Sequence, residues 1–179
     1  MKTMQLSMIA LCAVLLVVAA GCANYKITTP LEQPLDTAAQ WRIGEIRDAL
    51  PPDMEVEDKP DAYQYTVLGD KIREQIEKKK IFGNLAYSQP GQLEITGSII
   101  EFKKGSGFLR FLIGFGAGNS VLTTELQVRN RESGAVLFSG NFKGVVSSWA
   151  ESGEKCFDAV AKDFAKALQK QQKKLLKGK

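Results

Sequence analysis

Residues 120–130 alternate apolar and polar side chains more regularly than any other part of the sequence. The apolar positions on one side of this alternation are Leu122, Leu126 and Val128. A period of two is typical of a β-strand with one face buried and the other in water. A turn ending at Gly134 follows, and residues 136–146 continue as a returning strand, with Val136, Phe138, Phe142 and Val146 as its apolar positions. The two segments are therefore predicted to form an antiparallel hairpin.

Two segments upstream of this hairpin also have the pattern of strands. Residues 41–47 alternate until Pro51 and Pro52 end the pattern, and residues 92–103 carry Leu93, Ile95 and Ile99 on one face. The alternation slips at Ile99 and Ile100, which predicts a bulge or burial of both faces. Residues 85–88 could add a further short strand.

Helical spacing occurs twice, from Pro60 to about Lys80 and again after residue 155. The buried stripe of the second helix comprises Phe157, Val160, Ala161, Phe164 and Leu168. The order strand, helix, strand, strand, strand, helix favours an α+β fold. We expect a mainly antiparallel sheet of four to five strands, with the two amphipathic helices packed on one face.

The first 21 residues are predicted to be a signal peptide. Lys2 precedes an uncharged apolar run from Met8 to Ala20, and the small residues Ala19, Ala20 and Gly21 stand before Cys22. Removing residues 1–21 from the 179 leaves 158, which suits one domain. The alternative is an ordinary secreted protein that is cleaved near Ala20.

The sequence around Cys22 resembles the lipobox of bacterial lipoproteins. The resemblance implies cleavage before Cys22 and a covalent lipid on its thiol, which anchors the protein in a membrane. Ala23 stands where an Asp signals inner-membrane retention, so we expect the outer membrane of a Gram-negative bacterium. Residues 22–40 are predicted to be the lipidated cysteine and an extended tether, and residues 41–179 a single periplasmic domain with a basic C-terminal helix.

The composition removes many kinds of catalytic site. The chain has no histidine, which excludes Ser-His-Asp and Cys-His triads and His-containing zinc sites. Of the three cysteines, Cys156 has no partner left for a disulfide, and it is either a buried apolar side chain or a reactive thiol. Five acids lie on different elements and are interpreted as solvated surface: Asp61, Asp70, Glu94, Glu101 and Glu125. We therefore expect no enzyme, no metal and no cofactor besides the lipid on Cys22.

Residues 105–118 combine five glycines with large apolar side chains and a single charge. One interpretation is a strand connection that packs against the sheet. The other is an exposed surface for a partner or a membrane, with Phe108, Arg110, Phe111 and Phe115 as candidate contacts. The glycine spacing does not match a nucleotide-binding loop.

A family resemblance rests on this part of the chain. Residues 102–105, residues 109–118 with their Gly-Phe-Gly-Ala-Gly segment, and residues 132–137 resemble bacterial lipoproteins catalogued as domain of unknown function 4410. The resemblance implies a cell-envelope compartment and an α+β fold. It implies no catalytic residue.

The positive charge of the chain is concentrated near its C-terminus. The candidate contacts to an anionic surface are Lys166, Lys170, Lys173, Lys174 and Lys177. They either solubilise the end of a helix and complement its dipole, or they touch lipid headgroups or cell-wall polymer. Nucleic-acid binding is not expected, because the basic residues are not spread over a folded face with interleaved aromatics.

These observations favour a non-enzymatic outer-membrane lipoprotein that binds another envelope protein or assembles with copies of itself. The alternative is a module that binds or modifies an envelope polymer or a small molecule. A deep pocket lined by several of the five acids would favour the alternative.

Overall fold

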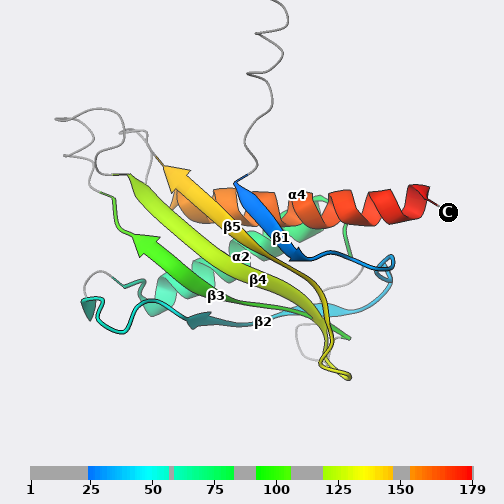
Figure 1. Ribbon diagram of the computed structural model, residues 1–179, viewed down its shortest axis with the longest axis horizontal. Helices are drawn as coiled ribbons and strands as arrows, with labels where there is room; N and C mark the ends of the chain where they lie inside the picture. The colour runs from blue at the N-terminus through cyan, green and yellow to red at the C-terminus, as the bar shows by residue number, and fades with distance from the viewer. Residues whose placement is uncertain (1–23, 57–58, 83–91, 106–118, 147–153, 179) are drawn as a thin grey trace, which may run out of the picture.

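The computed structural model describes residues 24–56, 59–82, 92–105, 119–146 and 154–178. The strands are β1 (Tyr25–Thr29), β2 (Trp41–Asp48), β3 (Leu93–Lys103), β4 (Ser120–Asn130) and β5 (Val136–Val146), and the helices are α2 (Ala62–Lys78) and α4 (Lys155–Lys177). The strands form one sheet in the order β1-β5-β4-β3-β2, and both helices cover the same face of it (Figure 1). The predicted α+β architecture is confirmed.

The hairpin of β4 and β5 forms the middle of the sheet, as predicted. Leu126 lies opposite Gly140, and the two strands stay paired from Ser120 and Val146 to Arg129 and Val136. The expected apolar positions of β4 are fully buried. Val136 differs, because it is 42% exposed at the turn, where the register of the two strands shifts. The slip predicted near Ile99 is also present, as an irregularity between Ile99 and Glu101.

The pairing of β2 with β3 is parallel, and it is the one parallel pair among the described strands. A parallel pair needs a crossover connection, which α2 supplies between the two strands. Asp61 caps α2 by accepting a hydrogen bond from the Gln64 backbone amide, and the Gln64 side chain accepts from the Asp61 amide in return. Leu68, Ile72 and Ile76 then face the core. Residues 85–88 lie outside the described part of the chain.

The predicted tether over residues 22–40 is wrong from Tyr25 onward. Tyr25–Thr29 form β1, an edge strand antiparallel to β5, and the Tyr25 ring stacks on Phe142 with ring centroids 5.7 Å apart. The segment after β1 buries its apolar side chains Leu31, Leu35 and Ala39 in the core. These residues belong to the domain because their apolar side chains complete its core, which an extended linker would leave in water.

Candidate functional site

Some of the residues singled out in the sequence lie within the described part of the chain, and others lie outside it. Cys22 and the candidate contacts Phe108, Arg110, Phe111 and Phe115 lie outside the described residues. The described residues on either side of residues 106–118 lie close together. Lys103 pairs with Val121, and the Gly105 amide donates to Ser120 Oγ at 3.2 Å. The roles of these five residues stay predictions.

The five candidate lysines of the C-terminal helix are all exposed. They lie on the side of α4 that faces away from its buried stripe, which ends at Leu168 and Gln172. Within the described part of the chain none of them forms an ion pair. Their ammonium groups are therefore available to an anionic surface or partner.

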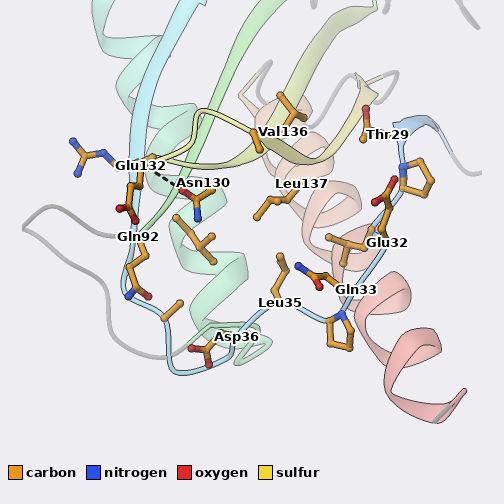
Figure 2. A pocket seen from close by; sticks show the side chains of 17 residues that line it. Thr29, Glu32, Gln33, Leu35, Asp36, Gln92, Asn130, Glu132, Val136 and Leu137 are labelled. Atoms are coloured by element: carbon orange, nitrogen blue, oxygen red, sulfur yellow. Dashed lines mark hydrogen bonds between the residues drawn. The ribbon is translucent and has the colours of Figure 1, made fainter.

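A pocket of about 1020 Å³ lies where the segment after β1 crosses the turn end of the β4–β5 hairpin (Figure 2). Leu35 and Leu137 point toward one another across its centre, and Glu32 and Glu132 lie at opposite sides. The pocket is lined by residues 29–36, Ala39, Gln92, Leu93, residues 130–132 and residues 135–137. Its walls thus come from three parts of the chain that are distant in sequence.

One buried side chain of α4 fixes the segment that closes this pocket. Gln172 is 6% exposed, and its amide accepts from the Leu35 N–H at 2.8 Å and donates to the Leu35 carbonyl at 2.7 Å. Both main-chain polar groups of Leu35 are thereby satisfied away from water. On the opposite wall, Asn130 Oδ1 accepts from the amides of Glu132 and Ser133 at 2.9 and 3.0 Å and shapes the turn.

The lining of this pocket offers side-chain amides and carboxylates that could hydrogen-bond a ligand. It contains Glu32, Asp36 and Glu132, and none of these is among the five acids interpreted from the sequence as solvated surface. No group of three potential metal ligands occurs in the described ranges. This pocket could not be predicted from the sequence, because its lining comes from segments that are distant along the chain and residues 29–36 were predicted to be part of a tether.

The face of the sheet opposite the helices carries a buried carboxylate. Glu94 is 2% exposed, although the sequence suggested solvated surface, and this expectation is wrong. Arg42 of β2 donates from Nε to Glu94 Oε1 at 2.8 Å, and Arg129 of β4 donates from Nε to Oε2 at 2.7 Å. Arg131 adds a third guanidinium, with Nε 3.9 Å from Oε1. One negative charge thus sits among three positive ones.

Gly44 provides the space for this carboxylate. A Cβ at position 44 would come within 2.7 Å of the Glu94 Cδ atom and of the Thr96 side chain. Burial raises the pKa of Glu94, but the hydrogen bonds and charges of Arg42 and Arg129 outweigh burial and hold the pKa below its ordinary value. Glu94 is therefore ionised at neutral pH and serves to order the two arginines.

Cys156 lies at the start of α4 and is 1% exposed. Burial raises the pKa of its thiol to about 11. A thiol that is protonated and buried at neutral pH is a poor nucleophile. Of the two interpretations of this residue, the buried apolar side chain fits the structure.

Neither helix of the described chain is both long enough and apolar enough to cross a lipid bilayer.

The family model described as domain of unknown function (DUF4410) matches residues 47–153 of this chain. The chain belongs to this family. The match confirms the resemblance seen in the sequence, while the Gly-Phe-Gly-Ala-Gly segment lies outside the described residues. No curated protein sequence matches significantly.

Solved structures of the PelC protein share this fold at low sequence identity. The PelC dodecamer from Paraburkholderia phytofirmans superposes with a TM-score of 0.58 and 13% identity, covering 80% of this chain and 96% of that chain. A variant of that protein gives a TM-score of 0.59 and 12% identity over 81% and 95%. A minor lipoprotein from Acinetobacter baumannii superposes less closely, with a TM-score of 0.34 and 10% identity over 75% and 94%.

Proposed function

We propose that this DUF4410 protein is a lipoprotein of the cell envelope, anchored in the outer membrane through Cys22, that assembles with copies of itself or with another envelope protein. It performs this role without catalysis and without a cofactor other than the covalent lipid. The position of β1 carries the proposal. Tyr25 is already part of the sheet, only three residues after Cys22.

That spacing determines where the domain lies relative to the bilayer. Three extended residues span about 10 Å, so a lipid on Cys22 brings the β1 edge of the sheet close to the headgroups. Acyl chains contribute roughly 0.8 kcal/mol per buried methylene, and two or three chains anchor a protein stably. The domain therefore rests near the membrane surface, and its remaining faces are available to partners.

Two observations support association with other proteins. Neither described helix covers the outer face of the sheet, and Arg42 and Arg129 on that face are about 40% exposed around Glu94. The PelC protein, whose fold this chain shares, is described as a dodecamer. Arginine is enriched in protein–protein interfaces, so partly exposed arginines on this face are consistent with contact to another protein.

Cell fractionation tests the anchor. The wild-type chain is expected in the outer-membrane fraction, whereas Cys22→Ser is expected to leave that fraction or to remain as an uncleaved precursor. Ser133→Cys provides a matched control, since it adds a thiol at an exposed turn and leaves Cys22 intact. A Cys22→Ser variant that is processed normally and still partitions with outer membranes would refute the anchor.

Gel filtration of the detergent-extracted protein tests the assembly. An apparent mass of several protomers, or a stable complex with a second envelope protein, is expected. A lone protomer in extracts where known envelope complexes stay intact would contradict this part of the proposal.

The pocket of about 1020 Å³ favours a second candidate function, the binding of a small molecule or a segment of envelope polymer. Its volume is at the upper end of the range for ligand sites, and its lining mixes apolar and polar groups. Leu137→Trp is expected to fill the centre and abolish such binding without breaking β5. Identical ligand spectra for Leu137→Trp and wild type after extraction under native conditions would exclude this candidate.

A further inference from the structure

The two helices are parallel but staggered, so a different helix end projects at each end of the molecule. Lys71, in the middle of α2, pairs with Asp158 in the first turn of α4 at 3.1 Å. The carbonyl of Lys79, just after α2, accepts from Gln169 Nε2 at 3.2 Å. Therefore α2 begins before α4, and α4 continues past α2. Figure 1 places the start of α2 and the C-terminus of α4 at opposite ends of the long axis.

The end at the start of α2 is acidic and has exposed apolar side chains. Within residues 45–61 the described acids are Glu45, Asp48, Asp53, Glu55 and Asp61. The bases of this range, Arg47 and Lys59, pair with Glu45 at 2.8 Å and with Asp48 at 3.4 Å, so Asp53, Glu55 and Asp61 are the excess acids. A groove of about 510 Å³ lies here, with Ile46, Val56 and Tyr65 among its lining residues. Val56 is 84% exposed and Tyr63 is 65% exposed. We call this surface the acidic groove.

The other end is basic. The last turns of α4, from Lys170 to Lys177, contain four lysines and no acid, and all four are exposed. Leu176 lies among them and is 55% exposed. The segment after β1, which packs against Gln172, carries Glu32 and Asp36, and both line the pocket of about 1020 Å³. We call residues 170–177 the basic helix end.

We propose that the basic helix end of one copy docks in the acidic groove of the next copy. Leu176 then covers the apolar lining at Val56, while the lysines approach the surrounding carboxylates. The occupant is inferred to be a second copy because this chain carries both surfaces. The acidic groove and the basic helix end are opposite in charge, and each has an exposed apolar side chain. The inference rests on the proposed self-association and names its surfaces.

Such a contact joins two different surfaces, so each copy uses one end toward each neighbour. Contacts of this head-to-tail kind close into rings when the rotation between neighbours permits. The start of β1 lies between the two charged ends in Figure 1. Rotation about a single axis keeps equivalent residues of all copies at the same height along that axis, so every Cys22 would lie on the same side of the ring, as anchoring in one membrane requires.

Disulfide trapping in cells tests the contact. Val56→Cys and Leu176→Cys are introduced together into the full chain, which keeps its own Cys22 and the buried Cys156. Non-reducing gels are expected to show a ladder of multiples of the protomer mass. Each single variant, and the pair Val56→Cys with Val136→Cys, is expected to show none, because Val136 is exposed but lies outside both surfaces.

The outcomes separate this inference from the proposed function. Extracts that contain a multi-protomer complex but give no ladder would overturn the head-to-tail contact and leave self-association standing. Dimers of Val56→Cys alone would also overturn it, since they indicate a twofold contact. Extracts that contain only protomers and give no ladder would overturn both the head-to-tail contact and self-association.

Charge reversal provides a second test that a folding defect cannot mimic. Lys173→Glu with Lys177→Glu, and separately Asp53→Lys with Glu55→Lys, are each expected to weaken self-association by roughly tenfold or more. Mixing the two double variants is expected to restore assembly, because each then offers the surface that the other has lost. If circular dichroism shows that both variants are folded and the mixture still fails to assemble, the proposal is overturned.

Discussion

Gly144 of β5 lies directly against the main chain of Cys156 at the start of α4. A Cβ at position 144 would come within 2.1 Å of the Cys156 carbonyl oxygen. Main-chain atoms cannot move aside as the tip of a flexible side chain can, so any larger residue must displace the helix. This glycine therefore sets the separation of α4 from the sheet.

Gly144→Ala is expected to destabilise the domain by about 2–4 kcal/mol, because the added methyl group forces the helix away from its packed position. Urea denaturation followed by circular dichroism measures the change. Gly134→Ala is the matched control, since nothing lies within 4 Å of its Cβ and only its positive φ of 72° adds a cost of about 1 kcal/mol. Equal losses at the two positions would contradict the close approach.

Glu94→Gln is expected to lower the free energy of unfolding by about 1–3 kcal/mol at neutral pH. The substitution removes the charge that Arg42 and Arg129 share, and the partial exposure of both arginines limits the cost. Glu101→Gln is the control, because its ion pair with Lys143 is half exposed and worth about 0.5 kcal/mol. A loss at Glu94 no larger than that at Glu101 would count against the role of the buried cluster.

The same carboxylate predicts a dependence of stability on pH. Because the folded pKa of Glu94 lies below its ordinary value of 4.5, its contribution is complete above pH 4.5 and is lost as the pH falls through the folded pKa. The stability difference between wild type and Glu94→Gln should therefore shrink in acid. Thermal melts at pH 7 and at successively lower pH check this, and a constant difference would be the contrary result.

Cys156 is expected to react with thiol reagents only after unfolding. Its side chain is 1% exposed, and its pKa of about 11 keeps the thiol protonated at neutral pH. Ser133→Cys, at an exposed turn, provides a reference thiol that should react within the mixing time. Labelling of both cysteines at similar rates in the native protein would show that Cys156 is accessible.

Gln172→Leu is expected to cost about 1–3 kcal/mol and to expose residues 30–39 to proteases. The substitution leaves the N–H and carbonyl of Leu35 buried without partners. Gln171→Leu, the neighbouring control, should leave both stability and cleavage nearly unchanged. Equal protease resistance of the two variants would mean that the amide does not hold the segment.

The elements that could be predicted are those whose own period identifies them. The alternation over residues 120–130 and the helical stripe from Phe157 to Leu168 each follow from one contiguous segment. The strand Tyr25–Thr29 was not predicted because five residues, followed closely by prolines, are too short to show a clear alternation. Its pairing with β5 depends on a segment more than 100 residues away. Parallel pairing of β2 with β3 likewise depends on α2 lying between them.

The Glu94 cluster was missed for a similar reason. Arg42, Glu94 and Arg129 are far apart in sequence and meet because the registers of β2, β3 and β4 place them in one row across the sheet. The pocket closed by Gln172 also needs contacts between distant segments. In contrast, Cys22 was predicted from a short local signal, and it remains the residue on which the account of function depends.

Mass spectrometry of the N-terminal peptide from the membrane-extracted protein is the decisive test of the lipid anchor on Cys22. The mature chain is expected to begin at Cys22, with the added mass of a diacylglyceryl group and, where the amino group is also modified, of a further acyl chain. A mature chain that begins at another residue, or an unmodified Cys22 thiol, would contradict it.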